Sequence, residues 1–305
     1  MLVFEIAHIF PKMRGHRRRL RARLAGIQLR SMSMSVLSSL TPALATIAQQ
    51  IGHAVEIEFT RYLIGAAGVA VLYWLIQRWI EPRRIQAGKA SFADRRREFR
   101  RSVETIFVFS LVNLLTFAMF RAGWLPVNRG APDIGIMVAQ IIAMVIMHDA
   151  WFYWMHRSLH LKVLFRRAHA THHVSRTPTS WAAYSFAPIE AIFESIYVPV
   201  MFLIISHIVP IQPWAAFIFL GHQIARNAVG HSGFELAWPG FTRSPLTGWL
   251  TTTTHHDLHH TEGRYNFGLY FTWWDRMMGT EHPKYHERFE AVVGANRAVT
   301  TSVVA

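Results

Sequence analysis

Histidines are the residues most able to do chemistry in this sequence, and their spacing is informative. Thirteen of the 18 histidines lie between His148 and His260. Two segments read His-x-x-His-His, at 169–173 and 256–260, and the segment at 156–160 reads His-x-x-x-His. On a helix, positions i, i+3 and i+4 share one face, so each segment can direct its imidazoles to one point. Burying so many imidazoles without a partner would be costly, and the pattern therefore indicates metal ligation.

The donor set limits which metal such a site can hold. The chain has no cysteine, which excludes thiolate sites and Fe–S clusters and leaves nitrogen and oxygen ligands. Asn227 and His231, again four residues apart, add a further pair. A catalytic zinc takes about three protein ligands, so this many nitrogens fit two ions better than one. Imidazole suits Fe, Cu, Zn and Ni, and a site at a membrane face, where O2 is soluble, favours two irons.

Three other histidines lie near these segments but outside their spacing. At 3.6 residues per turn, His148 lies about 80° around a helix from His156, which makes it a weaker candidate ligand. We expect His222 and His255 to lie around the site or at the surface.

Long apolar stretches must position these histidines. The sequence is 51% hydrophobic and only 16% charged. About 20 residues cross a bilayer as a helix, and four stretches are long enough: 62–80, 103–124, 134–154 and 189–209. After Pro210 and Pro213 a further apolar run, 214–220, could form a hairpin that dips into the membrane and returns. We predict an all-α integral membrane protein with about four transmembrane helices.

Positive charge predicts the orientation of these helices. The net charge of +14 is concentrated beside the apolar runs, in clusters at 17–23 and 78–101. This placement favours a membrane protein over a nucleic-acid-binding one, because arginine and lysine mark the cytoplasmic ends of spans. The loop between the first two spans should be cytoplasmic and the link at 125–133 outside. The third span then returns near His156, so the histidines should face the cytoplasm, in a bacterium beneath the inner membrane.

The basic N-terminal stretch, 12–30, complicates this topology. Only one clear span separates it from the basic loop, so both are cytoplasmic only if the weakly apolar residues 36–59 also enter the membrane. If those residues stay outside the membrane, translation could start at Met32 or Met34, or the stretch could be a disordered tail that lies on anionic lipid.

The stretch from about His148 to Thr280 resembles the fatty acid hydroxylase/sterol desaturase superfamily. Besides the histidine segments, the resemblance rests on these residues: Asp149, Phe152-Tyr153-Trp154, Arg157, His231-Ser232-Gly233, Asn266-Phe267-Gly268 and Trp274-Asp275-Arg276-Met277-Met278-Gly279-Thr280. The combination is specific, whereas the spans before His148 match only in general character.

The resemblance implies a four-helix membrane base under a cytoplasmic helical cap that holds two irons. The implied ligands are His156, His160, His169, His172, His173, His231, His256, His259 and His260. It also implies that Asn227, one turn before His231, can hold a metal-bound water. The expected domains are a basic, disordered tail (1–35), N-terminal membrane helices (36–133), a hydroxylase-like di-iron domain (134–285) and a C-terminal tail (286–305).

The implied activity is O2-dependent hydroxylation of an unactivated C–H bond of a lipid, such as a fatty acyl chain, sterol or sphingoid base. Desaturation of a similar lipid is the alternative. No Gly-x-Gly-x-x-Gly fingerprint occurs in the sequence, so neither a flavin nor a dinucleotide site is predicted. We therefore expect a separate electron donor, either a ferredoxin or a b-type cytochrome with its reductase.

Acids and aromatics near the histidines have two interpretations. Metal-bound histidines donate their second N–H to a carboxylate or carbonyl, and five acids are placed for this: Asp149, Glu190, Glu194, Asp257 and Asp275. Glu190 and Glu194 could instead be an interfacial carboxylate pair, and Arg157 could pair with an acid or a lipid headgroup. The aromatics could line an acyl tunnel or form an interfacial belt; they are Trp151, Phe152, Trp154 and Trp181.

Two other functions fit the histidines less well. A membrane zinc hydrolase usually carries His-Glu-x-x-His, which is absent from the sequence. A b-type cytochrome or metal transporter would need histidines in the middle of spans, whereas these segments follow span ends or lie in polar loops.

Overall fold

The computed structural model describes the backbone of residues 44–303 and the side chains of residues 44–294. The expected N-terminal tail and both alternative start methionines lie outside the described residues. The chain divides into two compact units, Met1–His53 and Ala54–Ala305. The second unit contains every residue predicted to form the site.

Three helices in the described part of the chain are long and apolar enough to cross a membrane: α4 (Phe92–Arg121), α5 (Ile134–Leu159) and α8 (Pro188–Ser206). A bent pair, Leu44–Leu75 with Gln77–Arg83, passes the same test as one broken span. Residues 44–303 contain no β-strand and only isolated bridges. The prediction of an all-α membrane protein with about four spans is confirmed.

The predicted span over 62–80 is not one straight helix, so the prediction is wrong on this point. The helix bends by 78° at a break after Leu75, where Ile76 adopts φ −97° and ψ 8°, outside the α-helical region. Before the break lie a π-helical segment, η1 (Leu63–Ala67), and α2 (Gly68–Leu75). After it come α3 (Gln77–Ile80) and η2 (Glu81–Arg83). A continuous apolar run predicts burial but carries no signal for a bend.

Glycine allows η1 to lie directly against α9 (Pro213–Gly230). A Cβ atom added to Gly65 would collide with the side chain of Ile224. Ile224 in turn belongs to a buried cluster with Tyr62 and Phe109. The apolar run expected at 214–220 forms only the first part of α9. The second part of this helix carries the polar residues Gln223 and Asn227.

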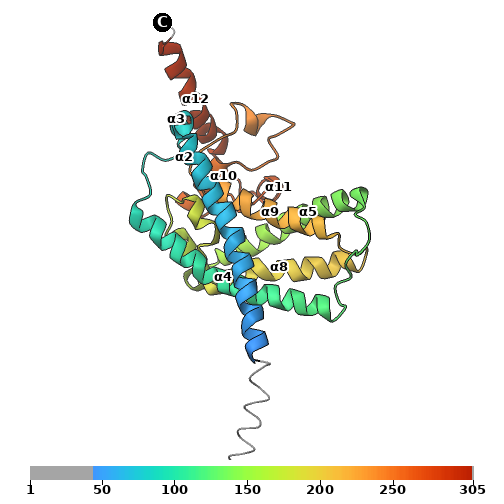
Figure 1. Cartoon of the computed structure of the whole chain (residues 1–305). Coiled ribbons are helices and arrows are strands. Elements are labelled where there is room, and N and C mark those ends of the chain that lie inside the picture. Colours follow the sequence, from blue (N-terminus) through green and yellow to red (C-terminus); the bar gives the residue numbers. More distant parts are fainter. Residues whose placement is uncertain (1–43, 304–305) are drawn as a thin grey trace, which may run out of the picture. The chain divides into compact units, whose positions relative to one another are not determined.

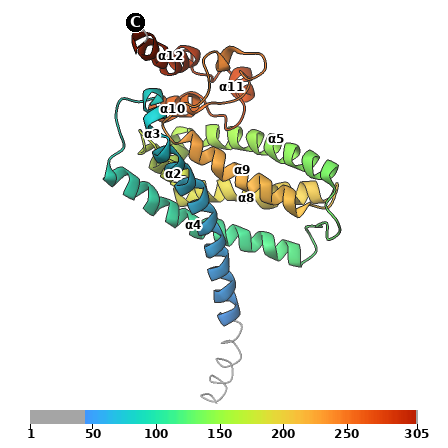
Figure 2. The same cartoon turned by 45° about the horizontal axis from the view of Figure 1, so that its top comes forward.

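Helices α5, α8 and α9 lie side by side, and α4 packs against α8 (Figures 1 and 2). Buried side chains fill the space between α5, α8 and α9, including Met144, Tyr197, Met201 and Phe219. Helix α4 begins with a capping box, in which Ser91 and Asp94 exchange hydrogen bonds. Asp133 caps α5 by accepting a hydrogen bond from Ile136 N. Helix α8 begins with Pro188, which needs no backbone donor there.

Short helices outside the candidate spans carry six of the nine predicted histidine ligands. They are η3 (Phe165–His169), α7 (Ala170–His173) and α10 (Thr253–Glu262). Helix α12 (Tyr285–Val303) covers the region expected to be a tail. Its Tyr285 and Phe289 form a buried cluster with Leu258 of α10, so this part of the chain supports the helix that bears the third histidine segment.

Candidate metal centre

The structure brings the nine predicted histidines into two adjacent groups. The first contains His156, His160, His169, His173 and His259, and the second contains His172, His231, His256 and His260. Within each group the potential ligand atoms lie within 4.8 Å of one another. The site therefore has the donors for two ions, in a set of five and a set of four.

Each His-x-x-His-His segment contributes to both groups. In the first segment, His169 and His173 join one group while His172 joins the other. In the second segment the division is reversed, with His256 and His260 together and His259 apart. Residues i and i+4 share a helix face, whereas neighbours point about 100° apart. The doubled histidine thus places two ion sites beside each other.

The ring nitrogens that face one another in these groups are Nε2 atoms. In the first group the distance from His156 Nε2 to His169 Nε2 is 3.1 Å. In the second, His172 Nε2 and His231 Nε2 are 3.3 Å apart. Two nitrogens bound to one ion at about 2.1 Å and at right angles would lie about 3.0 Å apart. The spacing therefore fits ligands that share an ion.

The Nδ1 partners fix which nitrogen carries the proton. His156 Nδ1–H donates to Phe267 O at 3.1 Å, and His169 Nδ1–H donates to Glu190 Oε1 at 2.7 Å. His231 Nδ1–H donates to Asn227 O at 2.8 Å. A carbonyl can only accept, so the Nε2 atom of a neutral ring held in this way has a lone pair and no proton.

Burial keeps these rings neutral. It lowers the pKa of His173 and His231 to about 4 and that of His160 to about 3. The pKa values of the other histidines on η3, α7 and α10 are lowered well below the usual range by burial, and neighbouring histidines add to the effect; these are His169, His172, His256, His259 and His260. A neutral ring whose Nδ1–H donates to a carbonyl directs an Nε2 lone pair into its group, and a cation is what such an arrangement fits.

Only one of the five predicted acids contacts a clustered histidine. Glu190 is buried and accepts from His169, as expected. Asp149 instead accepts from the backbone N–H groups of Tyr270 and Phe271. Asp257 accepts from Gln86 Nε2 at 2.7 Å. Asp149 and Asp257 therefore do not accept from a clustered histidine, contrary to the prediction. Backbone carbonyls accept from several of these histidines, and their position cannot be read from the sequence.

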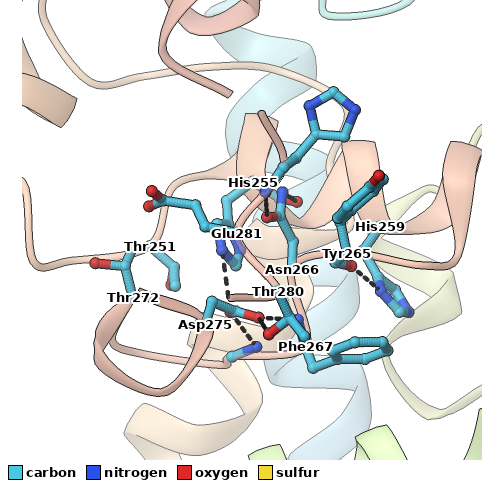
Figure 3. A network of polar contacts seen from close by, with 12 residues as sticks. Thr251, His255, His259, Tyr265, Asn266, Phe267, Thr272, Asp275, Thr280 and Glu281 are labelled. Carbon is cyan, nitrogen blue, oxygen red and sulfur yellow. Dashed lines mark hydrogen bonds and ion pairs between the residues drawn. The ribbon is translucent and has the colours of Figure 1, made fainter. Parts of the chain in front are cut away.

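Asp275 also has a different role from the one predicted. It accepts from Phe267 N at 2.9 Å and Gly268 N at 2.8 Å, and its nearest histidine is His255, at 3.3 Å. His255 belongs to neither group. Figure 3 shows this carboxylate at the centre of a polar network that holds the 265–268 loop in place.

That loop supplies acceptors that the sequence did not indicate. Tyr265 O accepts from His259 Nδ1 at 2.8 Å, and Phe267 O accepts from His156. Between them Asn266 adopts a positive φ of 59°, donates to His255 O and accepts from His282 N (Figure 3). Asparagine tolerates this conformation better than most residues, which is the one local signal that marks the turn.

Glu235 is a second residue that sequence reasoning missed. It is buried and accepts from Thr254 N at 2.9 Å and from Thr254 Oγ1 at 2.8 Å, at the start of α10. A carboxylate at a helix N-terminus stabilises the helix and satisfies its free donors. Glu235 lies 19 residues before Thr254, so no spacing rule connects the two.

His148 is not among the clustered histidines, and Asn227 lies one turn before His231. Asn227 Nδ2 donates to Ala183 O at 2.7 Å. His148 is buried, with Nδ1 2.9 Å from Tyr270 Oη and Nε2 3.3 Å from Gln223 Nε2. Both residues line a small cavity together with Glu194. His222 is exposed, with its ring 5.1 Å from that of Tyr270.

Two of the four predicted tunnel aromatics face a groove between α5 and α8. Trp151 and Trp154 line this groove, which has a volume of about 640 Å³ and is mainly apolar. Phe152 instead packs 5.0 Å from the ring of His156. Trp181 does not line this groove and lies beside Tyr62, with ring centroids 6.2 Å apart. Arg157 contacts the hydroxyl of Tyr153 at 3.0 Å rather than an acid.

The fold and the site define a helical membrane protein with two histidine groups for metal ions. Residues 141–280 match the family described as "Fatty acid hydroxylase". The resemblance to the fatty acid hydroxylase/sterol desaturase superfamily that the motifs predicted is confirmed over this segment.

Curated proteins similar to the chain are sterol-oxidising enzymes by name. Lathosterol oxidase of Homo sapiens is 30% identical over 192 residues, which cover 61% of this chain and 60% of that protein. C-4 methylsterol oxidase erg25 of Schizosaccharomyces pombe is 28% identical, with 51% of each chain covered. Methylsterol monooxygenase erg25B of Aspergillus fumigatus is 29% identical, with 50% of each covered. The chain thus spans about half to three fifths of the length of these relatives. No solved structure matches it.

Replacing Glu190 with glutamine tests the hydrogen bond to His169. Glutamine has the same size, but its amide is a weaker acceptor than a carboxylate and does not favour the required tautomer. Loss of such a partner typically lowers metal affinity about 10–100-fold. We expect the variant to lose metal at lower chelator concentrations than the unmodified protein, measured by titration with a metal indicator. Equal retention by both would contradict this role for Glu190.

Proposed function

We propose that the chain is a membrane-bound, non-haem di-iron oxidoreductase that uses O2 to hydroxylate an unactivated C–H bond of a lipid. The observation that carries the proposal is the pair of histidine groups whose Nε2 atoms face one another, with backbone carbonyls that accept from Nδ1 of four of these rings: His156, His172, His231 and His259. The proposed ligands are the nine clustered histidines, with Asn227 holding a metal-bound water beside His231. Iron, when bound there, would supply the activation of O2.

The chain's own residues would bind the substrate and exclude water. The groove that holds Trp151 and Trp154 lies between two candidate membrane spans and offers an apolar surface to a lipid. Phe152 and Phe186 pack against one histidine of each group, with ring centroids 5.0 Å from His156 and 5.2 Å from His172. These rings would separate the reacting carbon from bulk water, which strengthens the electrostatic interactions inside the site.

The lipid class follows from the relatives and from the membrane. Their names specify sterols, so a sterol is the first substrate to test, before fatty acyl chains and sphingoid bases. Desaturation is the alternative outcome at the same site. Lipid profiles of cells with and without the gene distinguish the two, because hydroxylation adds one oxygen to the product and desaturation removes two hydrogens.

Metal content tests the proposal directly. The protein purified in detergent should contain two irons per chain and should consume O2 in the presence of lipid and an electron carrier. One zinc per chain with no iron would favour a membrane zinc hydrolase. The absorbance of haem would favour a b-type cytochrome. Either result would contradict the di-iron oxygenase.

We further propose that the site faces the cytoplasm, in a bacterium from the inner membrane, and receives electrons from a separate ferredoxin or b-type cytochrome. Arginines exposed near the start of α4, including Arg95, Arg96 and Arg100, offer a docking surface to an acidic carrier. O2 and the lipid would reach the site through the membrane.

A reporter placed after Lys89 tests this orientation. Lys89 is exposed in the loop between the bent helix pair and α4, so an inserted domain should not disturb the fold. The basic residues around it predict a cytoplasmic location. We expect a fused green fluorescent protein to fluoresce and a fused alkaline phosphatase to be inactive. Active phosphatase at this position would reverse the proposed topology.

A further inference from the structure

A small, partly enclosed cavity near the histidine groups has a polar side, of which only Asn227 takes part in the proposed metal ligation. Its volume is about 20 Å³, enough for one water molecule. Apolar walls come from Phe152 and Phe186, each of which also packs on a clustered histidine. The polar side is formed by His148, Glu194, Gln223 and Asn227.

Glu194 is the one carboxylate that lines this cavity. It lies one helical turn after Glu190 on α8, but the two have different surroundings. Glu190 is bound to His169, whereas within residues 44–294 the carboxylate of Glu194 has no protein hydrogen-bond partner. A carboxylate in such a position needs either a proton or a water molecule.

The neighbours of Glu194 are arranged to hold a water. Gln223 Nε2 can only donate, so it donates to His148 Nε2, and His148 Nδ1–H then donates to Tyr270 Oη. This orients the amide of Gln223 and leaves its Oε1 free to accept. With Glu194 and Asn227 the cavity has three polar partners for one water, which is the usual number for a buried water.

The proposed reaction needs protons at the histidine groups. Hydroxylation joins O2, one C–H bond, two electrons and two protons to give one alcohol and one water. Desaturation takes two hydrogens from the lipid and gives one alkene and two waters, again with two electrons and two protons from outside the lipid. In both cases a carrier protein supplies the electrons, and the protons must enter a site whose histidines are held neutral by burial.

We propose that Glu194 passes these protons to the reacting oxygen, through one water held in the cavity by Glu194, Gln223 and Asn227. The carboxyl gives a proton to the water, the water gives one to the oxygen that is being reduced, and Glu194 regains a proton from solvent. This inference rests on the proposed oxygenase function, whichever of the two products is formed.

Glu194→Gln in the iron-loaded protein tests the proposal. Glutamine keeps the size and the hydrogen bonds of the side chain but carries no transferable carboxyl proton. We expect product formation to fall about 100-fold or more, the scale of general acid catalysis. Iron content and the KM for lipid should stay within twofold to threefold. The solvent deuterium isotope effect on product formation should increase, and Glu194→Asp should recover part of the rate.

Three outcomes would overturn the assignment: full turnover in Glu194→Gln, a loss of iron that matches the loss of activity, or a raised KM with unchanged kcat. The last would make Glu194 a substrate-binding residue. Glu104→Gln is the matched control, because Glu104 is exposed on α4 and pairs with Arg101. If the unmodified protein forms no O2-dependent product, the proposed function fails, and not the role of Glu194 alone.

Discussion

Replacing His259 with alanine is expected to remove one of the two proposed metal ions, and replacing His172 should remove the other. His259 Nε2 lies 3.0 Å from His173 Nε2 in the first group, and His172 Nε2 lies 3.3 Å from His231 Nε2 in the second. Each variant removes a donor from one group only. We expect metal content to fall from about two ions per chain to about one, and turnover to fall below detection.

Elemental analysis of the purified variants measures the first effect, and an assay with lipid, O2 and a chemical reductant measures the second. His207→Ala is the control, because His207 is exposed and, among residues 44–294, its ring has one hydrogen bond, to Leu203 O at 2.8 Å. It should keep both ions and full activity. Full activity in His172→Ala or His259→Ala would refute the ligand assignment. Loss of both ions from each variant would show that the two groups bind cooperatively.

The spacing of the histidines predicted that the members of each segment converge, and the family resemblance implied the full set of nine, but neither predicted how they divide. The i, i+3, i+4 pattern requires only that the members of one segment lie near one another on a helix. It does not reveal that His172 separates from His169 and His173 to face His231. That division depends on how α7, α9 and α10 pack, and long-range packing leaves no periodic trace in a single sequence.

The hydrogen-bond partners of the ligands were harder to predict. Glu190 was found because it is an acid that begins an apolar helix near the histidines. The carbonyl acceptors were not found, because every residue has a carbonyl and only the folded backbone shows which ones are free. Phe267 O and Tyr265 O face the site because of the turn at Asn266. The bend after Leu75 was not predicted for a similar reason, since a helix break inside an apolar run needs no proline.

Asp275→Ala should destabilise the protein strongly, although Asp275 is in neither histidine group. The carboxylate is fully buried and accepts from Phe267 N, Gly268 N and Thr280 Oγ1. Alanine would leave these donors buried without a partner, at a cost of about 1–3 kcal/mol each for groups that cannot reach water. We expect the free energy of unfolding to fall by at least about 3 kcal/mol. Because Phe267 O holds His156, the same change should also weaken metal binding.

Thermal unfolding in detergent, followed by tryptophan fluorescence with and without chelator, measures both effects. Asp275→Asn should be intermediate, because its one carbonyl oxygen can still accept from the loop while its amide adds a donor that has no acceptor there. Glu281→Ala is the control from the same network (Figure 3): Glu281 forms an ion pair with Arg276 at 3.0 Å, near the surface. Such pairs contribute at most about 1 kcal/mol. If Asp275→Ala unfolds no earlier than Glu281→Ala, the 265–268 loop does not depend on this carboxylate, and the positions of His156 and His259 must be fixed by the helices alone.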